Sequence, residues 1–258
     1  ERDFGLGNGI NQFDVDRPNR ILKVGDRFGY DYNLNITRAS SWIQSVFKFN
    51  KLDFFVAGTL SQTSFYRQGN IRNGIFPNDS YGKGTANSFL NYAGKAGVTY
   101  KINGRNYVYV NGAYLTRAPY FENVYISPRT RNAQQSDLQS EEILSGEVAY
   151  VLNTPTIKAR VGGYYTQFKN GMDVMVFYHD FYQNFVNYAI RGIDRLHFGG
   201  ELGLEVKLSP TVTLNAAAAI GRYYFDSKQQ AVVTVDNSAA VIGRDIIYME
   251  NFRLPSTP

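Results

Sequence analysis

Long segments of this sequence alternate apolar and polar residues one by one. This alternation has the period of a β-strand, whose successive side chains point to opposite faces of a sheet. In residues 196–208, for example, Leu202, Leu204 and Val206 share one face. The opposite face of the same segment is polar and carries His197, Glu201, Glu205 and Lys207. The pattern therefore predicts a fold built from long strands with one apolar and one polar face.

The connections between these segments alternate between short and long. Turn-forming pairs mark four short connections, at Asn50-Lys51, Asn103-Gly104, Asn153-Thr154 and Ser209-Pro210. Long connections at residues 67–87, 117–142 and 169–195, and a fourth after residue 225, separate the hairpins. The third of them contains strand-like pieces of its own at residues 172–178 and 185–190. We predict nine strands, at residues 35–50, 52–66, 88–101, 105–116, 143–152, 156–168, 196–208, 211–225 and from about residue 244.

Two of the short connections predict a turn type or a register. Asn103-Gly104 is the pair that type I′ hairpins favour, because both central residues need a positive φ. A two-residue turn at Asn153-Thr154 would place Glu147 directly opposite Arg160, where opposite charges stabilise adjacent strands.

Strands of this length favour a membrane barrel over a soluble β-sandwich, which also alternates in hydrophobicity. Globular strands average about five or six residues, whereas barrel strands need about 9–11 residues to cross the hydrocarbon and then extend beyond it. Tyrosines near the short turns suit an interfacial aromatic girdle, and these are Tyr100, Tyr107, Tyr109 and Tyr150. No stretch approaches the roughly 20 apolar residues of a membrane-spanning helix.

Composition argues against several other classes of protein. The chain has no cysteine and two histidines, which leaves few schemes for thiol, zinc or triad chemistry. Its net charge of +5 is spread out, without a cluster of Lys and Arg that would indicate a nucleic-acid surface. We therefore expect no enzyme, no cofactor, no metal site and no nucleic-acid partner.

Several motifs resemble the barrel of TonB-dependent outer-membrane receptors. Residues 114–125, Tyr-Leu-Thr-Arg-Ala-Pro-Tyr-Phe-Glu-Asn-Val-Tyr, resemble the aromatic strand of that family that runs into Arg-Ala-Pro. Residues 137–142, Asp-Leu-Gln-Ser-Glu-Glu, followed by Ser-Gly-Glu-Val-Ala-Tyr at 145–150, resemble its N-P-D-L-x-P-E and S-x-E-x-G-Y pattern. Gly-Gly-Glu-Leu-Gly-Leu-Glu at 199–205 resembles a further family strand. The aromatic-rich long loops are most similar to those of Bacteroidota receptors.

The resemblance implies an all-β fold, a transmembrane antiparallel up-and-down β-barrel with short periplasmic turns and long extracellular loops. Family barrels have 22 strands, so residues 1–258 would be a barrel segment, the C-terminal part without the last strands, the plug domain or a signal peptide. The implied function is import of a scarce nutrient, a metal chelate, vitamin or oligosaccharide, across the outer membrane of a Gram-negative bacterium. The implied partners are outer-membrane lipid, the plug and remaining strands of the same protein, TonB through the plug, and a surface lipoprotein.

Candidate site residues fall into two sets. The polar strand faces predict a set that lines the lumen, namely Glu147, Lys158, Arg160, Glu201, Glu205 and Lys207. Ligand contacts are expected in the long loops, where aromatic and Arg side chains can stack on sugars or hold an anion. These candidates are Tyr120, Phe121, Tyr125, Arg129, Tyr178, His179, Phe181 and Tyr182.

Two alternatives remain open at this point. One is a small autonomous outer-membrane barrel, porin-like or structural, that is complete in itself. The other is a soluble β-sandwich that binds carbohydrate. Both alternatives predict that the 258 residues are the whole chain, whereas the receptor interpretation predicts that they are not.

Overall fold

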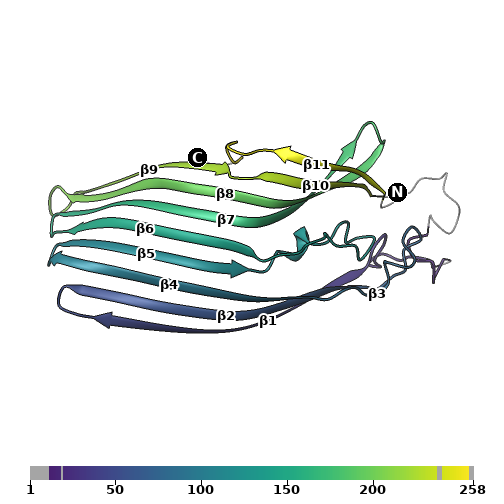
Figure 1. The fold of residues 1–258 in the computed structure, drawn as a ribbon, viewed down its shortest axis with the longest axis horizontal. Coiled ribbons are helices and arrows are strands. Elements are labelled where there is room, and N and C mark those ends of the chain that lie inside the picture. Colours follow the sequence, from purple (N-terminus) through teal and green to yellow (C-terminus); the bar gives the residue numbers. More distant parts are fainter. Residues whose placement is uncertain (1–11, 19, 237–239, 256–258) are drawn as a thin grey trace.

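The computed structural model describes residues 12–18, 20–236 and 240–255, which form one antiparallel sheet and a single 3-10 helix (Figure 1). The helix η1 is Phe121–Asn123. The strands are β1 Tyr32–Lys48, β2 Leu52–Gly69, β3 Gly82–Lys83, β4 Asn87–Asn103, β5 Asn106–Arg117, β6 Glu141–Asn153, β7 Ile157–His179, β8 Asn184–Lys207, β9 Thr213–Phe225, β10 Lys228–Val235 and β11 Val241–Tyr248.

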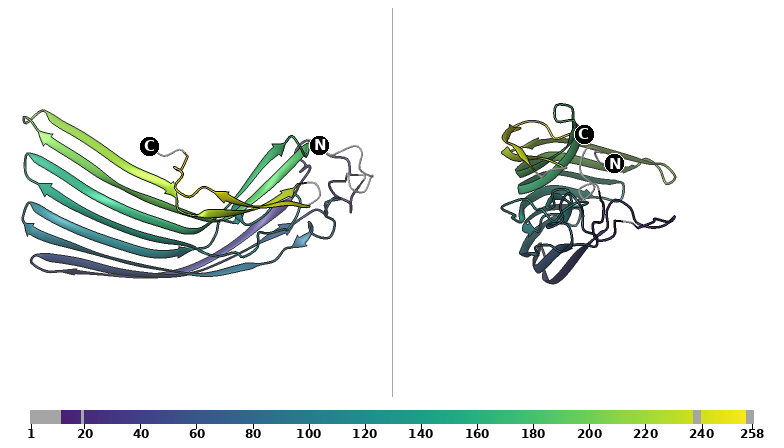
Figure 2. Two further views of the ribbon diagram at one scale, coloured as in Figure 1. Left: turned by 45° about the horizontal axis from the view of Figure 1, so that its top comes forward. Right: turned by 90° about the vertical axis from the view of Figure 1, so that its right-hand side faces the viewer.

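The strands follow one another in an up-and-down order, β1-β2-β4-β5-β6-β7-β8, and the sheet is open rather than closed. The short β3 pairs with the end of β2. Four tight turns gather at one end of the sheet, and the long connections lie at the other end together with the four-residue turn between β7 and β8 (Figure 1). The strands also curve along their length, so the sheet is bent rather than flat (Figure 2). This arrangement confirms the predicted all-β, up-and-down architecture.

The predicted count of nine strands is wrong, because the structure adds β3 and β10. The strand-like pieces predicted at residues 172–178 and 185–190 do form strand, but they continue β7 and β8, which have 23 and 24 residues, so residues 169–195 are not a long connection. The register shifts on either side of Gly171, next to Asn170 with a φ of 61°, and Gly192 has a φ of 67°. A bulge of this kind changes which face the following side chains point to, so the period-two pattern breaks there.

The C-terminal part of the sheet also differs from the prediction. Residues 195–207 of β8 pair with β9, and residues 186–191 of β8 pair with β10. The strand β10 was not predicted from the sequence. The last strand, β11, begins at Val241 and pairs with β10. After β11 the chain returns alongside β9, where Tyr224 and Arg253 form an isolated antiparallel bridge.

Two of the four tight turns, those of the β4–β5 and β6–β7 hairpins, depart from their predicted geometry. In the β4–β5 hairpin, Asn103 pairs with Asn106, so the central residues are Gly104 and Arg105, and neither Asn103 nor Gly104 has a positive φ. The predicted type I′ turn is therefore wrong. The Asn103 side-chain oxygen accepts hydrogen bonds from the backbone N–H groups of Arg105, at 2.9 Å, and Asn106, at 3.0 Å, which fixes an Asx-type turn instead.

One face of the sheet exposes an apolar band near the tight turns. The pairing register brings the tight-turn halves of these strands to the same level in the sheet, and alternate residues on this face are apolar or glycine. The segments concerned are residues 52–60 of β2, 90–100 of β4, 144–152 of β6, 157–165 of β7 and 196–206 of β8. Examples with about half of their surface exposed are Leu60, Val148 and Val161. The band matches the 9–11 residues that a tilted strand needs to cross hydrocarbon.

Aromatic residues mark both edges of this apolar band. Tyr100 and Tyr150 are exposed on the apolar face near the tight turns, whereas Tyr92, Tyr165 and Phe198 are exposed at its other edge. Such paired girdles are typical of strands that cross a membrane. The predictions for Tyr107 and Tyr109 are wrong, because register places both on the opposite, polar face.

The described residues form one sheet, and no second sheet packs on its apolar face. The β-sandwich alternative is therefore wrong, because a sandwich buries its apolar faces between two sheets. Among the described residues, no helix has the length and apolar character needed to cross a membrane.

Buried side chains lie instead under the long connections, on the polar face of the sheet. Phe65 of β2 packs with Val124 and Tyr125 of the β5–β6 connection. Arg67 of β2 is 2% exposed, and its guanidinium donates to the carbonyl of Pro128, at 2.7 Å, and to that of Ser80, at 2.9 Å. Burial lowers the pKa of Arg67. The long connections therefore form an ordered cluster rather than separate loops.

Candidate functional site

The six residues predicted to line a lumen all lie on one face of the sheet, opposite the apolar band. Register pairs Lys158 with Glu205 on β7 and β8, and their side chains form an ion pair at 2.9 Å. Glu147 of β6 forms an ion pair with Arg160 of β7. Glu201 and Lys207 lie on the same face and form no ion pair with another described residue.

The predicted register of Glu147 and Arg160 is wrong, although the two side chains do meet. Arg160 lies opposite Val151, and Glu147 lies opposite Tyr164. The β6–β7 hairpin pairs Asn153 with Lys158, so its loop holds four residues instead of two. The register between β6 and β7 is therefore shifted by four positions from the predicted one. Because four is an even number, Glu147 and Arg160 stay on the same face, and the long Arg160 side chain reaches along the strand to Glu147. The Tyr109 hydroxyl also donates to Glu147, at 2.6 Å, and extends the contact to β5.

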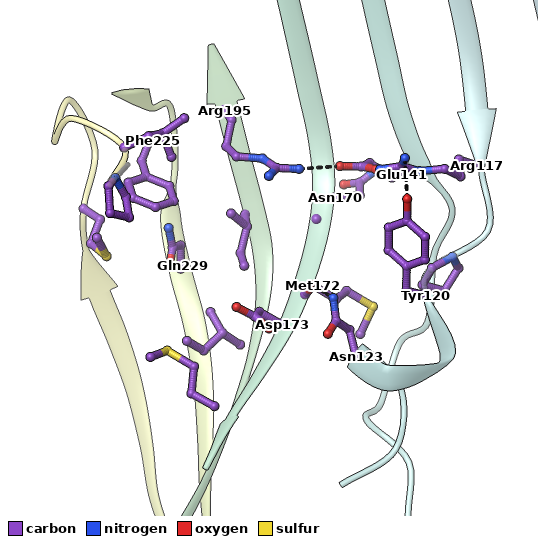
Figure 3. A pocket seen from close by; sticks show the side chains of 18 of the residues that line it. Arg117, Tyr120, Asn123, Glu141, Asn170, Met172, Asp173, Arg195, Phe225 and Gln229 are labelled. Carbon is purple, nitrogen blue, oxygen red and sulfur yellow. Dashed lines mark hydrogen bonds and ion pairs between the residues drawn. The ribbon is translucent and has the colours of Figure 1, made fainter. Parts of the chain in front are cut away.

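A cavity of about 650 Å³ lies on this polar face, beyond the apolar band (Figure 3). Glu141 lies in the wall of this cavity, and only 7% of its surface is exposed. The Arg117 and Arg195 side chains approach Glu141 from opposite sides. The Arg195 guanidinium lies 2.8 Å from one carboxylate oxygen, and Arg117 pairs with the other. Arg117 also donates to the Tyr120 hydroxyl at 2.9 Å.

Strand pairing positions these three charges. Arg117 is the last residue of β5 and lies directly opposite Glu141, the first residue of β6. Arg195 comes from β8, two strands away, and its guanidinium also lies 5.0 Å from the Phe168 ring centroid. A carboxylate held by two guanidinium groups is a rigid element, because each charge has a partner.

The rest of the cavity wall is mostly apolar. Its side chains include all three methionines of the chain, together with Ile190, Ile193 and Phe225. Gln229 of β10 also lines the cavity, is 2% exposed, and its amide nitrogen has no hydrogen-bond partner. The Nε atoms of Arg117 and Arg195 are likewise buried and unpartnered. The cavity thus offers apolar surface and free donors, which suits a ligand that has an apolar body and acceptor oxygens.

The predicted ligand residues of the β5–β6 connection occupy different environments. Tyr120 is more than half exposed, lines the cavity and stacks on the Arg117 guanidinium at 4.8 Å. Phe121 packs against the buried cluster around Phe65, and Tyr125 is 1% exposed within it. Arg129 lies over the ring of Tyr30, at 5.3 Å. Tyr120 is therefore well placed to contact a ligand, whereas Phe121 and Tyr125 hold the connection together.

The second predicted group lies at the tip of the β7–β8 hairpin and does not line the cavity. Phe181 is 82% exposed, and Tyr178 and Tyr182 are also exposed. The His179 ring lies 4.9 Å from that of Tyr182, and Phe181 contacts Tyr182 edge-on at 5.0 Å. The tip thus presents an aromatic surface, separate from the cavity. Among the described residues, no group of three or more His, Cys, Asp or Glu side chains is placed to hold a metal ion.

The sequence did not indicate that Arg117, Glu141 and Arg195 are site residues. Two of them stand in the motifs that carry the family resemblance, in Arg-Ala-Pro and in Asp-Leu-Gln-Ser-Glu-Glu. That signal indicated a strand end but not the contact between the two side chains. Arg195 has no sequence signal, because its pairing with Glu141 joins positions 54 residues apart.

Comparison with known proteins supports the fold. No family model matches the chain, and no curated protein matches it. Among the solved structures that match is the copper transporter OprC, with a TM-score of 0.62 and 12% sequence identity over 78% of this chain. The match covers 32% of OprC, so this chain spans about a third of the length of that protein. At this identity the likeness shows the fold alone, that of an outer-membrane β-barrel wall, and the similar protein is a transporter rather than an enzyme.

Proposed function

We propose that this chain forms part of the wall of a TonB-dependent receptor in the outer membrane of a Gram-negative bacterium. The main observation behind this proposal is that one face of the sheet is apolar and the other is polar. Its uncovered apolar band has the length of a membrane crossing, and its opposite face carries the ion pairs Glu147–Arg160 and Lys158–Glu205. In this proposal the apolar band contacts lipid, and the six charged residues face a hydrated lumen.

The tight turns then lie in the periplasm and the long connections outside the cell, as in other outer-membrane barrels. The remaining strands and the plug belong to other parts of the same protein, and TonB acts through the plug. The fold of the copper transporter OprC supports transport as the class of function. The family motifs support TonB dependence, and the aromatic-rich loops support the Bacteroidota type and a surface lipoprotein partner.

The imported nutrient is a metal chelate, a vitamin or an oligosaccharide. We place its first contacts at the exposed aromatic tip, on Tyr178, His179, Phe181 and Tyr182, and at the cavity beside Tyr120. Aromatic rings stack on sugars and chelators, and the Arg117–Glu141–Arg195 group fixes the wall against which a ligand would rest. Arg129 lies over Tyr30, so it contributes to loop packing as well as to any contact.

The test is uptake of a labelled panel of metal chelates, vitamins and oligosaccharides by cells that carry the complete protein. We expect saturable uptake of at least one compound, and we expect its loss when TonB is removed while the protein stays in the membrane. Conductance in planar bilayers is the second readout. A closed, plugged barrel supports the receptor, whereas uptake that ignores TonB, together with a steadily open pore, would establish the small porin-like barrel instead.

A further inference from the structure

The apolar band ends on β9 with an abrupt change from an aliphatic to a basic side chain. Ile220 is 80% exposed, and the next residue on the same face, two positions along, is Arg222. Arg222 is also exposed, and it forms no ion pair with any carboxylate of the described residues. Register places it opposite Phe198 of β8, one of the aromatic residues at this edge of the band.

A second arginine reaches the same place from the C-terminal segment. The Leu254 backbone N–H donates to the Tyr223 carbonyl, at 3.0 Å, and the Phe225 N–H donates to the Phe252 carbonyl, at 3.0 Å. These bonds align Arg253 with Tyr224 in an antiparallel bridge. Residues that lie opposite each other in such a pair share a face, so Arg253 lies on the apolar side, like Arg222.

The two arginines line one open cavity of about 590 Å³. Its other side chains include Phe198 and Tyr224, whose rings meet edge-on with centroids 6.1 Å apart. The cavity thus combines two guanidinium groups with an aromatic floor, and it lies where the band that faces hydrocarbon gives way to polar surface.

We propose that this cavity holds the phosphate headgroup of an outer-leaflet lipid, with the acyl chains running down the band past Ile220. This inference rests on the proposed function, because that orientation puts the long-loop edge of the band at the outer leaflet. Guanidinium groups bind phosphate oxygens through two parallel hydrogen bonds, and aromatic side chains favour the headgroup region. The apolar surface beside the arginines selects a lipid over a free anion, because only the lipid also covers Ile220.

The test measures lipid retention by native mass spectrometry on the complete protein in detergent. The probes are bis-phosphorylated lipid A, the same lipid without phosphates, and inorganic phosphate. We expect the phosphorylated lipid to bind at least about tenfold better than the dephosphorylated lipid, which corresponds to about 1.4 kcal/mol. The double variant Arg222→Ala/Arg253→Ala should lose this preference.

Lys169→Ala is the matched control, because Lys169 is an exposed cation on the same face, beyond the band, opposite Glu142. It should keep the preference, and heat-modifiable migration should show that every variant is folded. Equal retention by the double variant, or competition by inorganic phosphate as strong as that by the lipid, overturns the proposal. Loss of TonB-dependent uptake with lipid retention intact would count against the proposed function and not against this site.

Discussion

Tyr125 accepts, through its hydroxyl oxygen, a hydrogen bond from the backbone N–H of Arg67, at 2.9 Å and across 58 residues of sequence. Both residues are almost fully buried. Their contact joins the end of β2 to the β5–β6 connection, on the face of the sheet opposite the apolar band. The long connections are therefore held to the sheet by named bonds, so changes to those bonds have predictable effects.

Removing the Tyr125 hydroxyl leaves a buried donor without a partner. We expect Tyr125→Phe to destabilise this part of the protein by about 1–3 kcal/mol, because the Arg67 N–H then loses its acceptor in a dry environment. Hydrogen exchange of the Arg67 amide measures the effect directly. Tyr120→Phe is the control, since Tyr120 is exposed. Exchange at Arg67 that is unchanged in Tyr125→Phe would show that the bond does not hold the connection.

Two adjacent alanines of β9 test which face meets lipid. Ala217 and Ala218 are both exposed, lie at the same height and point to opposite faces. An arginine at the middle of a bilayer costs about 2–4 kcal/mol on the lipid face. We expect Ala218→Arg to lose about this much folding free energy, and Ala217→Arg to lose little, in urea titrations of the complete protein in lipid vesicles. Equal costs for the two variants would contradict the assignment of the faces.

Glu141 is predicted to stabilise the cavity wall through its two arginines. Glu141→Gln leaves two guanidinium groups facing each other without a carboxylate, and we expect a loss of about 1–3 kcal/mol. Chemical denaturation measures this loss. The control is Glu142→Gln, because the Glu142 carboxylate lies on the opposite face and forms no ion pair with a described residue. This substitution should leave the free energy of unfolding nearly unchanged. If both variants behave alike, the Arg117–Glu141–Arg195 contact contributes nothing specific.

Asp31 predicts a dependence on pH in the segment before β1. Burial alone would raise the pKa of Asp31, but hydrogen bonds from Asn70, at 2.9 Å, and from Arg27, with the charges of Arg27 and Arg17, lower it overall. A carboxyl group with a lowered folded-state pKa contributes stability above its unfolded value of about 3.8 and loses it as the pH falls further. The protection of the Asn70 amide, whose N–H donates to the Asp31 carbonyl, against hydrogen exchange relative to the intrinsic rate at each pH should therefore fall below about pH 4. Asp31→Asn should remove that pH dependence, and a fall in protection that persists in this variant would assign it to other groups.

The strand faces were predictable because the strand halves next to the tight turns keep a strict period of two. The six charged residues from Glu147 to Lys207 share one face for that reason. The pairing of Glu147 with Arg160 survived a wrong register, because an even shift leaves both residues on the same face. Turn length was not predictable, since the Asn153-Thr154 pair alone does not reveal that the loop holds four residues.

The upper part of the sheet was not predictable in the same way. Asn170 and Gly192 adopt positive φ angles beside a bulge, so alternation along β7 and β8 changes phase there. The strand-like pieces at residues 172–178 and 185–190 were predicted, but their continuity with the neighbouring strands was not. The cavity depends on contacts far apart in the sequence. Arg117 and Glu141 meet only because β5 pairs with β6, and Arg195 reaches Glu141 across β7. No local pattern carries such information.

The central claim is that one face of the sheet contacts lipid and the other water, and residues 158–165 of β7 test it most directly. The chain has no cysteine, so each position can carry a single Cys with a spin label in the complete protein, reconstituted in lipid vesicles. Collision rates with oxygen, which dissolves in lipid, and with a water-soluble nickel chelate report the environment of each label. We predict strict alternation, with 159, 161, 163 and 165 favouring oxygen and 158, 160, 162 and 164 favouring the chelate. Uniform access of the chelate to all eight positions, or an absence of alternation, would contradict the membrane-spanning barrel.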